Sequence, residues 1–179
     1  MERIRLIVRD LHCFAYPSDY AKEESFRLTT AIGSALRFTS HTAKDITINN
    51  LIDKDYWVVG SKSHIIRVLI NLVSNSQAAL LDRNAAMIKI NAQIEMTSQG
   101  EKVIIEVWDN GSGIEPSALE KVFDPFYTTK EIGAGLGMGL GICSTIIQNH
   151  GGTLKVASVL DNFTSCTFDL ALAPQNRTT

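Results

Sequence analysis

The stretch that decides the fold runs from Ser61 to Leu81 and reads SKSHIIRVLINLVSNSQAALL. Its apolar residues recur three and four positions apart, which is typical of a helix that buries one face. A serine at its first or third position can cap the start. Asn71 and Asn75 interrupt the apolar stripe and, with Arg67, share one helix face. A single such amide commonly bonds to a loop, but two aligned amide oxygens also suit Mg²⁺, which takes oxygen ligands.

Other elements follow when the chain is read outward from this helix. An amphipathic helix is predicted over residues 1–16, and residues 17–25 read as a linker. Further helices are predicted at 28–38 and 140–150, and strands at 46–51, 56–59, 87–96, 103–108, 153–159 and 166–172. The polar turn 53–55 joins the first two strands. This order predicts a mixed α+β fold, with helices packed on one face of a mostly antiparallel sheet.

A polar, glycine-containing segment, Asp109-Asn110-Gly111-Ser112-Gly113, follows the apolar strand 103–108. These residue types are common in turns, and a turn is the simplest interpretation. The alternative is a binding site. There the carboxylate accepts a hydrogen bond from an amino group, and the glycines let the backbone approach a flat ring closely.

Two more segments precede the helix predicted at 140–150. Residues 123–130 read FDPFYTTK and suggest an apolar anchor for a loop. Residues 133–141 read GAGLGMGLG, and alternating glycines before a helix expose consecutive amide N–H groups to an anion. The glycines also permit the mobility of an active-site lid. Neither a Walker motif nor a G-x-G-x-x-G motif is present, which excludes P-loop and Rossmann nucleotide sites.

Taken in this order, the asparagine helix, the Asp109 segment, the 123–130 loop and the glycine segment resemble the ATP-binding catalytic domain of sensor histidine kinases, within the wider GHKL ATPase group. The loop and glycine segments look most like those of the nitrogen-, dicarboxylate- and oxygen-sensing kinases. The resemblance implies a two-layer, Bergerat-type ATP-binding fold over residues 26–174, followed by a tail at 175–179. It also implies that residues 1–16 end a dimerisation and phosphoacceptor hairpin.

The resemblance further implies that the domain binds ATP and Mg²⁺. Asn75 matches the metal ligand and Asn71 lies beside the metal's water shell, so both count as catalytic. Asp109 matches the carboxylate that reads the adenine amino group, with Gly111 and Gly113 beside the base. The remaining nucleotide contacts implied by the resemblance are Phe126, Thr129, Lys130, Gly135, Leu136, Gly137, Met138, Gly139, Leu140 and Thr167.

Two of these positions, and the neighbouring Gly141, carry specific expectations. Phe126 is expected to anchor the near end of the lid, and Thr167 to place a hydroxyl near the adenine. Gly141 departs from the family, because many relatives have serine there. We expect this glycine to loosen the start of the helix without touching a catalytic role.

The family's phosphate acceptor is a histidine followed by an acidic residue and, a few positions on, a proline. None of His12, His41, His64 and His150 has that context. The resemblance therefore implies transfer to a histidine on a separate dimerisation domain of a homodimeric parent protein, and relay to a response regulator. The alternatives are a GHKL ATPase that drives a conformational switch, or a nucleotide-binding docking module without catalysis. Hydrolysing relatives typically carry glutamate where this chain has Asn71, which argues against the first.

Composition limits the remaining possibilities. The 179 residues are 45% hydrophobic and 20% charged, with a formal charge of −2, which is typical of a globular domain. Basic residues are not in excess, so the charge gives no indication of a nucleic-acid partner. Cys13, Cys143 and Cys166 are too scattered for a disulfide framework or a zinc site, which favours a reducing compartment. We therefore expect a cytoplasmic domain, and leave an inner-membrane anchor of the parent protein open.

Overall fold

The structure is a computed structural model that describes residues 23–40, 45–81, 83–97, 100–128 and 137–174. In chain order its elements are β1 (Glu24–Arg27), α2 (Leu28–Thr39), β2 (Thr47–Asn50), β3 (Trp57–Gly60), α3 (Lys62–Ala79), β4 (Met87–Thr97), β5 (Gly100–Asp109), α4 (Pro116–Leu119), α5 (Gly139–Asn149), β6 (Leu154–Val159) and β7 (Phe163–Ala171). The helix predicted at 1–16, most of the linker 17–25 and the tail 175–179 lie outside the described residues. Among those described, no helix is both long and apolar enough to cross a bilayer.

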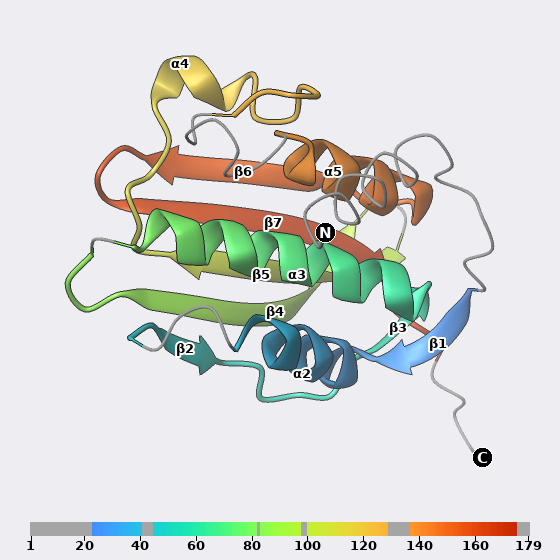
Figure 1. The fold of residues 1–179 in the computed structure, drawn as a ribbon. Helices are drawn as coiled ribbons and strands as arrows, with labels where there is room; N and C mark the ends of the chain where they lie inside the picture. Colours follow the sequence, from blue (N-terminus) through green and yellow to red (C-terminus); the bar gives the residue numbers. More distant parts are fainter. Residues whose placement is uncertain (1–22, 41–44, 82, 98–99, 129–136, 175–179) are drawn as a thin grey trace, which may run out of the picture.

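Five strands form the main sheet in the order β2-β4-β5-β7-β6. Strand β2 runs parallel to β4, and the other neighbouring pairs are antiparallel. Strands β1 and β3 form a separate antiparallel pair. Helices α2, α3 and α5 lie side by side on one face of the main sheet (Figure 1). The predicted two-layer α+β fold, with helices on one face of a mostly antiparallel sheet, is confirmed.

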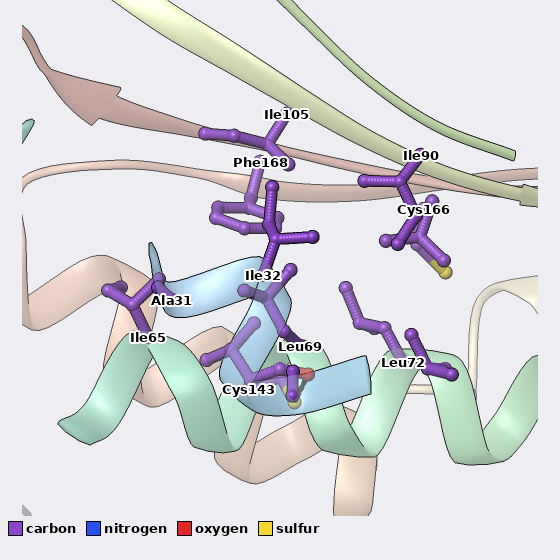
Figure 2. Close-up of a cluster of buried hydrophobic side chains, with 14 of the residues drawn as sticks. Ala31, Ile32, Ile65, Leu69, Leu72, Ile90, Ile105, Cys143, Cys166 and Phe168 are labelled. Carbon is purple, nitrogen blue, oxygen red and sulfur yellow. Dashed lines mark hydrogen bonds between the residues drawn. The ribbon is translucent and has the colours of Figure 1, made fainter. Parts of the chain in front are cut away.

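The core lies between these helices and the sheet. Strand β5 alternates strictly, so every second side chain from Val103 to Asp109 is buried against the helices. Helix α3 buries the apolar stripe that its spacing predicts. Figure 2 shows side chains of α2, α3 and α5 meeting Ile90, Ile105 and Phe168 of the sheet. Phe168 is 1% exposed, and its truncation to alanine is expected to cost about 3–5 kcal/mol.

Helix α3 starts where the sequence predicts. The Ser61 hydroxyl accepts a hydrogen bond from the backbone N–H of His64 at 3.4 Å, so Ser61 is the cap. The Ser63 hydroxyl instead lies 3.1 Å from that of Ser61. The start of the helix that carries both asparagines is thus held by a defined contact.

The strands differ from the sequence prediction in two respects. Strand β1 was not predicted, because its four residues bury only Phe26 and show no apolar periodicity. The strands predicted at 46–51 and 56–59 exist as β2 and β3 but do not pair. Strand β2 joins β4, whereas β3 joins β1, so the turn between them links two sheets. Asp55 in that turn accepts a hydrogen bond from Thr29 at 2.8 Å.

Candidate functional site

The site begins with Asp109, the last residue of β5. The alternation of β5 turns this side chain toward the helices, and it is only 2% exposed. Among the described residues it is the one buried carboxylate. A carboxylate in such a place requires hydrogen-bond donors, because desolvating its charge is costly.

Two donors hold the Asp109 carboxylate. The Ser76 hydroxyl of α3 donates to Oδ2 at 2.6 Å, and the backbone N–H of Gly111 donates to Oδ1 at 2.9 Å. Burial raises the pKa of Asp109 above its usual value, and these two hydrogen bonds oppose that rise. Each oxygen keeps lone-pair capacity beyond its single donor, so the ionised group can accept a further hydrogen bond from an amino group.

The glycines after Asp109 are required by the fold itself. A Cβ on Gly111 would lie 2.7 Å from that of Ala79, at the end of α3. Gly113 has a φ of +68°, and a Cβ there would collide with the carbonyl oxygen of Val159. The loop therefore fits closely between α3 and the turn from β6 to β7. Contact of either glycine with a base stays a prediction.

Asn71 and Asn75 lie on α3 and face helix α5. The amide nitrogen of Asn71 donates to the Cys143 sulfur at 3.6 Å. The amide nitrogen of Asn75 lies 3.9 Å from where a Cβ on Gly139 would stand, at the first residue of α5. Both side chains are half-buried. The two predicted amides thus share one face, next to the start of a helix whose free N–H groups favour an anion.

Two buried cysteines, Cys143 and Cys166, lie beside this site. Burial raises the pKa of the Cys166 thiol to about 12, with smaller contributions from Asp109 and Cys143. Cys166 therefore acts as a small apolar group, whereas Cys143 accepts the hydrogen bond from Asn71.

The start of α5 packs against the loop that precedes it. Gly137 has a φ of +67°, and a Cβ there would lie 2.5 Å from the Tyr127 carbonyl oxygen. Met138 is buried, and Leu140 packs against the core. A Cβ on Gly141 would lie 2.9 Å from the Phe123 carbonyl oxygen. The departure from serine at Gly141 therefore accompanies a close approach of this loop to α5.

Phe126 does not pack into the core, and its predicted role as the anchor of the near end of the lid stays a prediction. Its side chain is 65% exposed, whereas Phe123 packs against the core. Phe126 has a φ of +68°, which turns the chain so that its backbone, not its ring, meets Gly137. Phe126 stays a predicted nucleotide contact. Four predicted contacts in this region fall outside the described residues: Thr129, Lys130, Gly135 and Leu136.

Thr167, whose hydroxyl is expected near the adenine, lies on the opposite face of the sheet from Asp109. Its partner across the sheet is Glu106, whose side chain points away from the helices, whereas that of Asp109 points toward them. There Thr167 lines a polar hollow of about 300 Å³ with Glu106 and Lys155. Contact of Thr167 with the adenine stays a prediction. The residue directly across from Asp109 is Thr164. Its hydroxyl lies 3.1 Å from that of Ser158.

The sequence prediction also missed Ser76. This residue continues the buried stripe of α3, and a hydroxyl at a core-facing position signals a buried polar partner. Ser76 and Asn75 are consecutive and point about 100° apart around the helix. Helix α3 thereby presents Asn75 to α5 and Ser76 to Asp109. It brings the predicted amide and carboxylate groups into one site.

Comparisons with known proteins point to one family. Residues 60–174 match the family described as histidine kinase-, DNA gyrase B-, and HSP90-like ATPase. The chain is 34% identical over 161 residues to sporulation kinase A of Bacillus subtilis, covering 88% of this chain and 25% of that protein. It is 31% identical over 159 residues to the C4-dicarboxylate transport sensor protein DctB of Rhizobium meliloti, again covering 88% and 25%.

Solved structures agree with these relatives. The nucleotide-free catalytic domain of histidine kinase ThkA matches with a TM-score of 0.72 at 31% identity, covering 87% of this chain and 99% of that one. The chain spans about a quarter of the length of the two curated relatives, but almost all of the solved catalytic domain.

Proposed function

The chain belongs to the family of histidine kinase-, DNA gyrase B- and HSP90-like ATPases, and we propose that it binds Mg·ATP between α3, the loop after β5 and the start of α5. It is an ATP-binding catalytic domain of the histidine kinase type. We further propose that the γ-phosphate passes to a histidine on a separate dimerisation domain, and from there to a response regulator.

One observation carries the proposal. Asp109 is buried and held by Ser76, and the preceding residue of α3, Asn75, faces the first turn of α5. Helix α3 thus has the Asp109 carboxylate, a hydrogen-bond acceptor, on one side and the electropositive start of α5 on the other. This suits a ligand with an amino-bearing ring at one end and phosphates at the other.

The donor set fits Mg²⁺. Because the amide nitrogen of Asn71 is engaged by Cys143, its carbonyl oxygen is the atom left for a cation or its waters. Asn75 would hold the ion, which keeps other oxygen ligands from phosphate and water. Bound there, it supplies neutralisation of the phosphate charge.

The protein's own contribution is positioning. Transfer breaks the bond between the γ-phosphorus and its bridging oxygen, forms a bond to a histidine nitrogen and releases ADP. The first turn of α5 directs N–H groups at the phosphates, and Asp109 fixes the base. Asn71 is an amide and cannot take a proton from water, which favours transfer over hydrolysis. Because the donor is ATP, we propose a cytoplasmic location.

The test is reconstitution with labelled ATP. The chain is incubated with γ-labelled ATP and Mg²⁺, alone and with a dimerisation domain that carries an acceptor histidine. We expect acid-labile, base-stable label on the added domain and none on the chain alone. The Asn75→Ala variant should transfer nothing, whereas Asn91→Ala, on strand β4 outside the site, should transfer normally. Label retained on the chain alone, or release of phosphate without transfer, would contradict the proposal.

A further inference from the structure

Arg83 bridges two loops that border the site. It follows the end of α3, and its Nη2 donates to the Gly111 carbonyl oxygen at 2.8 Å. The same nitrogen donates to the Asp161 carbonyl oxygen in the turn between β6 and β7. One guanidinium therefore joins the loop after Asp109 to a turn that is far away in sequence.

The neighbouring backbone contacts lead to the same loop. The Ser112 N–H donates to the Ala79 carbonyl at the end of α3, at 3.1 Å. The Asp161 N–H donates to the Ser112 carbonyl at 2.7 Å. The loop is thus clamped between α3 and the turn, and Arg83 is the charged group in this set of contacts.

Gly111 links this clamp to the carboxylate. Its carbonyl accepts from Arg83, and its N–H donates to Oδ1 of Asp109 at 2.9 Å. A shift of Gly111 would therefore turn or release the carboxylate. Arg83 can thus affect the Asp109 carboxylate through Gly111, without touching the carboxylate itself.

We propose that Arg83 is a positioning residue for recognition of the purine amino group. It holds Gly111 so that the Asp109 carboxylate faces a bound base in one orientation. This inference rests on the proposed function, because it assumes that Asp109 reads the base. A guanidinium suits the task, since its planar donors reach two carbonyl oxygens while the charge strengthens both hydrogen bonds.

The quantity to measure is the preference for ATP over an analogue that lacks the amino group, rather than the affinity for ATP alone. Dissociation constants are measured for ATP and for purine riboside triphosphate, which has hydrogen in place of the 6-amino group. The unmodified chain should prefer ATP. In Arg83→Ala that preference should fall about tenfold, the loss expected for one hydrogen bond to a charged group. Arg83→Lys should keep part of it.

A matched control separates positioning from folding. Arg37 is exposed on α2, where it donates to the Ser34 hydroxyl, and Arg37→Ala should leave the preference unchanged. General destabilisation by Arg83→Ala would weaken the binding of both nucleotides equally. An unchanged ratio of the two dissociation constants overturns the inference. If the alanine variant does not fold, the lysine variant is read instead, and a preference equal to that of the unmodified chain overturns it. If the unmodified chain binds no ATP, the proposed function fails and this inference fails with it.

Discussion

Nε2 of His150 accepts a hydrogen bond from the backbone N–H of Ser61 at 2.9 Å, although the two residues are 89 positions apart. Because a backbone N–H only donates, this ring nitrogen carries no proton. The other, Nδ1, lies 2.7 Å from the Ile146 carbonyl oxygen and donates to it. The His150 ring therefore ties the end of α5 to the cap of α3, the two helices that flank the proposed phosphate site.

His64, which lies beside this connection, should make the stability of the domain depend on pH. His64 lies beside His150, with ring centroids 6.1 Å apart. Burial lowers the pKa of His64, and the charges of His150 and Arg67 lower it further. The unfolded chain thus protonates His64 more readily than the folded chain does. Stability that is present above about pH 6.5 is therefore lost as the pH falls toward the lowered pKa of His64 in the folded chain.

Urea denaturation between pH 8 and pH 5 measures this dependence. The free energy of unfolding should fall below about pH 6.5. His64→Gln cannot take up the proton, so its profile should be flatter. Parallel profiles for both proteins would rule out His64 as a source of the pH dependence.

Gly60→Ala should destabilise the domain. Gly60 has a φ of +150°, and a Cβ there would collide with the His150 ring. We expect a loss of about 1–3 kcal/mol from backbone strain and displacement of the ring, measured by chemical denaturation. Gly100→Ala is the control, because Gly100 also has a positive φ, +106°, but nothing within 4 Å of the added Cβ. Equal losses in the two variants would show that contact with His150 contributes nothing.

Asn75→Ala should abolish Mg²⁺-dependent ATP binding and leave the fold intact. The side chain is half-buried, so its loss should lower the free energy of unfolding by only about 1 kcal/mol. Calorimetric titration with ATP, in Mg²⁺ and in chelator, separates the metal-dependent part of binding. Unchanged affinity in Mg²⁺ would remove Asn75 from the metal site.

Ser76→Ala should make ATP binding more sensitive to acid. Burial already raises the pKa of Asp109, and Ser76 opposes that rise, so its removal raises the pKa further. A protonated Asp109 accepts the hydrogen bond from the base less well. As the pH falls, the affinity for ATP should therefore begin to decline at a higher pH than in the unmodified chain. Binding curves from pH 8 to pH 5 test this. Ser74→Ala, on the exposed side of α3, should behave like the unmodified chain.

Local patterns were sufficient to predict the elements around the site. The three- and four-residue spacing in α3 predicts which face is buried, and the nearly continuous apolar run in β5 predicts a central strand that ends at the Asp109 loop. Asn71 and Asn75 share a face for the same reason. Each of these features depends only on residues within one or two helical turns or within a single strand. The local sequence is therefore enough to predict it.

Contacts between distant segments were decided only by the tertiary structure. The register of β7 on β5 puts Thr164, not Thr167, across from Asp109, and a shift of one residue would reverse the two faces. The hydroxyl of Ser76 on Asp109 and the N–H of Ser61 on His150 likewise join separate elements. Such pairings depend on how whole elements pack after long loops close, and no local periodicity encodes that packing. The sequence thus determined the residue types, elements and buried faces of the site, while the packing of α3 against β5 and α5 decided which partners those residues have.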